Sequence, residues 1–178
     1  MFESLWPWPM PNTNYANRGK SLETIIEYAN EQYKAKGVAL VQKVATPWTV
    51  IRRGKQIVSA FPAEKSTVDF IGVVSGGNPV AFDAKQCKST TSFPLSNVEQ
   101  HQLNFLRLWE FNGGTSFLLI EMAELRKIYR VEFHQLMIYW NQAANGGKKS
   151  IPIKNLKAFK EVGELGGIVL DYLGLMGR

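Results

Sequence analysis

Cysteine and histidine are nearly absent from this chain of 178 residues. With one cysteine, Cys87, and two histidines, His101 and His134, the chain can form neither an internal disulfide nor a structural zinc site of the Cys/His type. Long apolar runs are also lacking, since none approaches the roughly 20 residues that span a bilayer. The first nine residues show no basic segment before an apolar one. We therefore expect a soluble, cytoplasmic protein.

The composition is that of a single compact domain. Hydrophobic residues make up 45% of the chain and charged residues 20%, which excludes a disordered protein and leaves enough apolar side chains for a core. Residues 1–16 are rich in proline and tryptophan and show no periodicity. We expect this segment to be an N-terminal arm, and residues 17–178 to form one domain without internal repeats.

The net charge of +6 is concentrated in one region. Between residues 34 and 65 the only acid, Glu64, is outnumbered by seven basic residues: Lys34, Lys36, Lys43, Arg52, Arg53, Lys55 and Lys65. A basic block of this kind favours a polyanion partner such as nucleic acid, because neutralised phosphates release counterions. A solvated surface explains the same pattern equally well, so composition alone leaves the two interpretations open.

Hydrophobic periodicity and turn residues predict the elements of the fold. The pattern indicates a helix from Ser21 to Gly37, and Ser96-x-x-Glu99 has the form of a capping box that would open a second helix ending at Gly113. A third helix is expected over 133–144, followed by a short helical piece after Pro152. Strands are expected at 38–44 and 48–52 as a pair, at 68–74 and 80–86 as a hairpin, and at 115–122, 128–133 and 167–173. This order fits an α/β fold in which a mixed central β-sheet is flanked by helices.

The hairpin at 68–86 brings two carboxylates together. If its turn centres on Gly76, Asp69 lies opposite Asp83, with Cβ atoms about 5 Å apart. Because side chains alternate along a strand, Thr67 shares a face with Asp69, and Lys85 with Asp83.

Facing carboxylates destabilise a sheet unless a positive charge neutralises them. A bound hard cation would give a phosphodiester hydrolase site, in which Lys85 stabilises the charge that develops on phosphate. Alternatively, Lys85 alone supplies the charge, and the residues form an ordinary cross-strand ion pair on a solvated face. The spacing by itself leaves both possibilities open.

A carboxylate followed about fourteen residues later by an Asp-x-Lys triplet resembles the PD-(D/E)xK nuclease core, which has a restriction-endonuclease-like fold. The chain from Asn17 to Tyr172 further resembles RecU-type Holliday junction resolvases. The motifs that carry the resemblance occur in the same order and spacing: Asn17–Gly19, Leu22-Glu23, Ser66–Gly72, Phe82–Lys85, Phe93–Leu95, His101-Gln102, Gly146–Pro152 and Asp171-Tyr172.

The resemblance implies roles for individual residues. The family's Mg²⁺ positions fall on Thr67, Asp69, Asp83 and Gln102, and its transition-state lysine falls on Lys85. Glu23 matches a glutamate of the first helix near the active site, and a solvated helix acid is an equally good interpretation of it. Arg18 and Lys43 fall on positions linked to junction binding. A protruding stalk is implied at about 52–65, with Arg52, Arg53 and Lys55 as its DNA-binding residues.

By the same resemblance we expect a homodimeric endonuclease that depends on Mg²⁺, or alternatively Mn²⁺. It would nick two strands of four-way junction DNA symmetrically, with recombination proteins as partners, in a bacterium or in the host of a phage. One departure is that Asp83 stands where the family usually has glutamate, which bears on metal preference. A duplex or repair endonuclease of the same fold and a non-catalytic protein that binds branched DNA are the alternatives.

Overall fold

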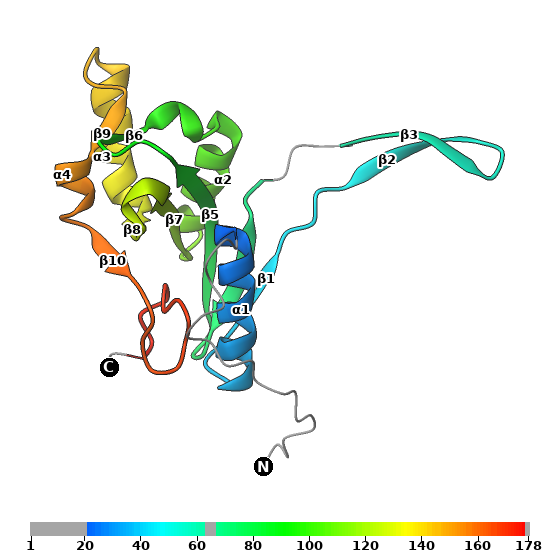
Figure 1. The fold of residues 1–178 in the computed structure, drawn as a ribbon, viewed down its shortest axis with the longest axis horizontal. Helices are drawn as coiled ribbons and strands as arrows, with labels where there is room; N and C mark the ends of the chain where they lie inside the picture. The colour runs from blue at the N-terminus through cyan, green and yellow to red at the C-terminus, as the bar shows by residue number, and fades with distance from the viewer. Residues whose placement is uncertain (1–20, 63–66, 177–178) are drawn as a thin grey trace.

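The computed structural model describes residues 21–62 and 67–176, and it places a six-stranded mixed sheet at the centre of the molecule (Figure 1). In spatial order the strands are β1 (Ala39–Lys43), β4 (Phe70–Val74), β5 (Asn78–Cys87), β7 (Thr115–Met122), β8 (Lys127–Glu132) and β10 (Lys160–Val162). Only the β5–β7 pair is parallel. The predicted fold class is therefore confirmed. In the described part of the chain no helix is long and apolar enough to span a membrane.

Helices cover both faces of this sheet because its strands are apolar on both sides. On one face α1 (Leu22–Ala35) packs against Phe82, Phe117 and Leu119. On the other face α2 (Gln100–Phe111) and α3 (Phe133–Ala144) pack against the alternating residues, among them Leu118. The remaining elements are η1 (Leu95–Asn97), η2 (Ala123–Leu125), α4 (Ile153–Leu156), and a two-stranded sheet of β6 (Ser92–Pro94) with β9 (Ser150–Pro152).

A ladder of aromatic rings fixes the register of the central strands. Phe70 lies opposite Phe82, and Phe82 lies beside Phe117, with ring centroids 5.0 and 4.7 Å apart in stacked geometry. At the other end of the hairpin, the turn after Val74 contains Gly76 at φ 94°, a conformation that favours glycine. The predicted hairpin and its register are confirmed.

The strands predicted at 38–44 and 48–52 exist, but they do not pair with each other. β1 pairs with β4, whereas β2 (Trp48–Arg53) pairs with β3 (Gln56–Pro62). The β2–β3 ribbon projects away from the sheet (Figure 1), and every side chain of β2 is exposed. The predicted stalk is therefore a hairpin that begins at Trp48, four residues before its expected start. The pattern of strand residues does not show which strands pair. β1 pairs with β4, and the whole β2–β3 ribbon lies between these two strands in the sequence.

The second helix starts later than its Ser96-x-x-Glu99 pattern predicted. Residues 95–97 form a single 3₁₀ turn, and the N-cap of α2 is Glu99 in extended conformation. The capping box is Glu99-x-x-Gln102, in which the Glu99 N–H donates to Gln102 Oε1 at 3.1 Å. The capping prediction was wrong because two overlapping patterns fit the sequence, and packing of the buried Leu95 selects the later one.

The strand predicted at 167–173 is also absent from the structure. The chain here is irregular, and the last strand is instead β10. The apolar residues of the segment 167–173 are buried against α1 and do not pair with a strand of the sheet. Asp171 holds this segment in place, since its carboxylate accepts hydrogen bonds from Tyr33 Oη at 2.8 Å and from the N–H groups of residues 174–176 at 3.1 to 3.2 Å.

Replacing Asp171 by alanine should lower the free energy of unfolding by roughly 3 kcal/mol, because Tyr33 Oη and three backbone N–H groups lose a charged acceptor. Urea denaturation of the Asp171→Ala variant measures this. Glu164→Ala, at an exposed position nearby, is the control and should stay within about 0.5 kcal/mol of the parent. Equal stability of both variants would contradict the anchoring role of Asp171.

Candidate active site

The β4–β5 hairpin brings the two predicted carboxylates together at one end of the sheet. The β4–β5 register ends at the pair Phe70 and Phe82, and Asp69 and Asp83 are the next residues outward along the two segments. Asp69 lies just before β4, where its Oδ2 accepts a hydrogen bond from the Ala84 N–H at 2.8 Å. Asp83 lies within β5 and is fully buried on the face covered by α2.

Asp83 is surrounded by one cation and one amide. The Lys85 Nζ lies 2.6 Å from Oδ2, and Gln102 Nε2 donates to Oδ1 at 3.1 Å. Despite the nearby ammonium, Oδ2 accepts no well-formed hydrogen bond within the described part of the chain. Burial, with a smaller contribution from the Asp69 carboxylate, raises the pKa of Asp83 to about 7, although Lys85 opposes both effects. This site is therefore short of positive charge when both carboxylates are ionised.

Lys85 reaches this position because it lies two residues after Asp83 on the same strand face. Its side chain is 17% exposed, so the ammonium is largely shielded from water. A shielded cation beside a buried carboxylate can interact strongly with a further anion that enters the site.

Gln102 is held in place by the start of α2. Its Oε1 is bound by the Glu99 N–H, which leaves Nε2 directed at Asp83. The predicted metal-ligating atom, Oε1, is thus already one partner of the capping box. A second lone pair on this oxygen is available to a cation or to a cation-bound water.

The residues present fit a hard divalent cation. Asp69 and Asp83 supply two carboxylates, and the buried Asp83 Oδ2 lacks a good hydrogen-bond donor. Among residues 21–62 and 67–176, no three His, Cys, Asp or Glu side chains form a metal-binding group. Mg²⁺ does not require three, because it is commonly bound by one or two carboxylates together with water and substrate phosphates. Thr67 is exposed in the bend before Asp69, outside the strand, so strand alternation does not fix its orientation.

Glu23 and Lys43, which the sequence assigned to separate roles, form an ion pair. Lys43 Nζ lies 2.5 Å from Glu23 Oε2 and 3.5 Å from Glu27 Oε1, and the bond to Glu23 raises the pKa of Lys43. Glu23 thus pairs with the end of β1 and is not part of a carboxylate trio with Asp69 and Asp83. Its catalytic role and the DNA-binding role of Lys43 remain predictions.

The other predicted DNA-binding residues lie apart from this site. Arg52 and Arg53 end β2, and Lys55 lies in the following turn, so all three are exposed on the β2–β3 ribbon. Arg18 and the N-terminal arm lie outside the described residues.

The sequence analysis did not identify two residues that contact the predicted site residues. Glu27 forms an ion pair with Lys43 beside that of Glu23, and the Glu99 N–H positions the side chain of Gln102. The Glu99-x-x-Gln102 pattern of a capping box could have identified Glu99.

Comparison with known proteins gives one consistent result. A family model described as Recombination protein U matches residues 17–178. The Holliday junction resolvase RecU of Pediococcus pentosaceus is 38% identical over 155 residues, which cover 84% of this chain and 75% of that protein. The same-named protein of a Geobacillus species is 33% identical over 172 residues, 93% of this chain and 85% of the relative. That of Levilactobacillus brevis is 37% identical over 147 residues, covering 79% and 73% respectively.

Without divalent cations, the contribution of Asp83 to the free energy of unfolding should fall as pH rises from about 4 to about 7. In this interval the folded state keeps the Asp83 proton, since its pKa is raised to about 7, whereas an unfolded Asp releases it near pH ~3.9. The side chain of the Asp83→Asn variant does not titrate, so residue 83 makes no pH-dependent contribution to its free energy of unfolding. Urea denaturation in chelator should show the parent losing stability relative to Asp83→Asn by up to about 1.4 kcal/mol per pH unit. A difference that does not change with pH would contradict the raised pKa.

Proposed function

The chain belongs to the Recombination protein U family, and from this premise we propose that it is a structure-specific DNA endonuclease that resolves Holliday junctions in recombination and repair. The observation that carries the proposal is the convergence of Asp69, Asp83 and Lys85 on one face at the end of the β4–β5 hairpin. Two carboxylates can hold a divalent cation, and a shielded ammonium can stabilise the negative charge that develops on phosphate during hydrolysis of a phosphodiester.

We further propose that Asp69 and Asp83 hold Mg²⁺, with Thr67 and Gln102 completing the set of ligands. When bound, the cation supplies Lewis-acid activation of the phosphate and of a water molecule. Mn²⁺ has the same preference for oxygen ligands and is the alternative. In the metal-free protein Lys85 partly neutralises Asp83, and a bound cation would supply the rest of the positive charge that this buried carboxylate needs.

Lys85 is proposed to act directly on the substrate. Its ammonium can donate to a non-bridging phosphate oxygen and stabilise the negative charge that develops there. Gln102 holds the Asp83 carboxylate in orientation through Oδ1, which leaves Oδ2 on the side of Lys85. Each active site cuts one strand, so paired symmetric nicks require two copies of the chain related by a two-fold axis. We therefore propose a homodimer.

The first test incubates a labelled four-way junction and a matched linear duplex with the protein, in Mg²⁺ or in chelator. We expect Mg²⁺-dependent nicks confined to the junction, at symmetric positions in two strands of like polarity. Asp83→Asn and Lys85→Ala should each lower the rate at least about a thousandfold, with junction affinity changed little.

The matched controls for these variants are Glu164→Gln and Lys127→Ala, which remove the same charges at exposed positions outside the site. Both should cut at the parent rate. Equal cutting of the duplex would indicate a general endonuclease, and binding without cutting would indicate an architectural protein. If Asp83→Asn or Lys85→Ala cuts as the parent does, the site is assigned wrongly.

We propose that the β2–β3 ribbon grips the junction. A two-stranded ribbon without a covering layer is only marginally stable in water, yet this one exposes Val50, Ile57 and Phe61 together with its basic tip. Exposed apolar and basic side chains on a projecting ribbon suit contact with bases and phosphates at a branch point.

Replacing Arg52, Arg53 and Lys55 together by alanine should weaken junction binding and reduce the slope of log K against log salt by about 1 for each DNA phosphate that these side chains neutralise in the parent. Binding titrations at several salt concentrations measure both quantities. The rate of cutting at saturating protein should change less than the affinity, because the catalytic residues are untouched. Unchanged affinity and slope would exclude the ribbon tip from DNA binding.

A further inference from the structure

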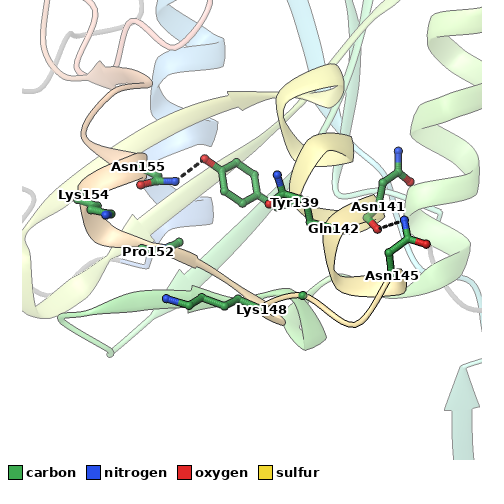
Figure 2. A pocket seen from close by; sticks show the side chains of 9 residues that line it. Tyr139, Asn141, Gln142, Asn145, Lys148, Pro152, Lys154 and Asn155 are labelled. Atoms are coloured by element: carbon green, nitrogen blue, oxygen red, sulfur yellow. Dashed lines mark hydrogen bonds between the residues drawn. The ribbon is translucent and has the colours of Figure 1, made fainter.

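A cleft lies outside the active site, between α3, β9 and α4. Its volume is about 580 Å³, and its lining includes Tyr139, Asn141, Gln142, Lys148, Lys154 and Asn155. In Figure 2, Lys148 and Lys154 lie on the side of Pro152, Tyr139 lies in the middle, and Asn141 and Asn145 lie at the opposite end. We call this feature the amide cleft.

The charged side chains in the lining of the amide cleft are all basic. No Asp or Glu lines it, and neither Lys148 nor Lys154 forms an ion pair with any residue that the structure describes. The carbonyls at the end of α3 are occupied, since Asn141 O accepts from Asn145 Nδ2 at 2.9 Å and Gln142 O accepts from the Gly147 N–H at 2.8 Å. Tyr139 Oη accepts from Asn155 Nδ2 at 2.8 Å, which leaves its own proton to be donated.

The amide cleft is joined to the segment between the catalytic strand β5 and α2. β9 pairs with β6, which follows β5 in the chain, and the Ile153 N–H at the start of α4 donates to Thr91 O at 2.8 Å. The Leu95 N–H donates to Lys149 O at 3.0 Å, just before the segment that leads to Gln102. Hydrogen bonds therefore fasten the cleft to the chain between Lys85 and Gln102, so a ligand in the cleft is held in a fixed relation to the active site.

We propose that the amide cleft binds the sugar-phosphate backbone of one duplex arm of the junction, away from the cut. This inference rests on the proposed function. Lys, Asn, Gln and Tyr side chains are those through which proteins contact DNA phosphates and sugars without reading sequence. A contact remote from the reacting bond orients the substrate, because binding energy from a distant part of the DNA positions the scissile phosphate. An acidic polypeptide offers the same charge, but the hydrogen bonds to residues 91–95, between the catalytic strand and Gln102, favour the substrate itself.

The test compares four proteins on junctions whose arms are shortened stepwise. They are the parent, Lys148→Ala/Lys154→Ala, the charge-retaining Lys148→Arg/Lys154→Arg, and the control Lys127→Ala/Lys160→Ala, which removes two exposed charges from β8 and β10. On long arms the cleft variant should bind more weakly, with a salt slope reduced by about 1 for each lysine replaced by alanine. The arginine variant and the control should match the parent.

The dependence of the binding defect on arm length distinguishes a contact with the arm from a general effect of charge. If the cleft holds an arm, the defect of Lys148→Ala/Lys154→Ala should disappear once the arms are too short to reach it. A defect that persists at every arm length, or a control that is equally impaired, would show that net charge alone is responsible and would overturn the inference. Parent-like binding by the cleft variant on long arms would overturn it as well, and would leave an acidic polypeptide as the occupant to test.

Tyr139→Phe gives an independent measure. It keeps the ring, which packs edge-to-face on Phe159, but removes a neutral donor. Affinity for long-armed junctions should fall by a few-fold with no change in salt slope, since the charge of the protein stays the same. If the parent cuts no junction at all, the proposed function fails. If the parent cuts and the cleft variants behave as the parent does, only the cleft inference fails.

Discussion

The register between β4 and β5 is the constraint on which the active site depends. Phe70 and Phe82 stack on the face covered by α1, so Asp83, the residue after Phe82 in β5, must face the other way, toward α2. A slip of β5 by one residue would direct both Asp83 and Lys85 toward the apolar cluster around α1 and separate them from Gln102. At Gly72 the opposing β1 backbone comes so close that a Cβ would lie 2.3 Å from Leu40 O, which holds β1 in register as well. Core packing on the face covered by α1 therefore determines which side chains lie at the active site on the face covered by α2.

Burial of Asp83 has a consequence for the rest of the site. A carboxylate inside the protein beside a second carboxylate is ionised at neutral pH only if positive charge is supplied, and Lys85 alone leaves its pKa at about 7. A hard cation would supply the remainder, so the deficit of charge is itself a physical reason for the site to bind metal. The capping box of α2 contributes too, because the same Gln102 that satisfies the Glu99 N–H also orients Asp83. The start of a helix and the order of the active site are thus coupled.

The elements that sequence predicted well are those specified by local signals. The helix bounded by Ser21 and Gly37, the hairpin around Gly76 and the helix over 133–144 follow from caps, turn glycines and periodicity, and the facing of Asp69 and Asp83 follows from the hairpin alone. The errors concern non-local contacts. The residues at 167–173 have the composition of a strand, but hydrogen bonds to Asp171 hold them against α1 instead. Similarly, only the partner of β1, some thirty residues away, excludes pairing with β2. The pairing of Glu23 with Lys43 depends on tertiary structure and has no sequence pattern.

The places where the basic segments join the fold explain how DNA binding and cutting can be coordinated. The β2–β3 ribbon is inserted between β1 and β4, so its second strand leads back toward Asp69. The amide cleft is fastened to residues 91–95, in the segment between β5 and α2. The two surfaces therefore join the chain on either side of the catalytic hairpin, one before Asp69 and the other after Lys85. The Lys43 pair with Glu23 and Glu27 joins the end of β1, the strand before the ribbon, to α1. If both proposed contacts form, a junction engages the ribbon and the amide cleft together, whereas a linear duplex engages one of them, and this difference gives a structural basis for selectivity without any base-specific contact.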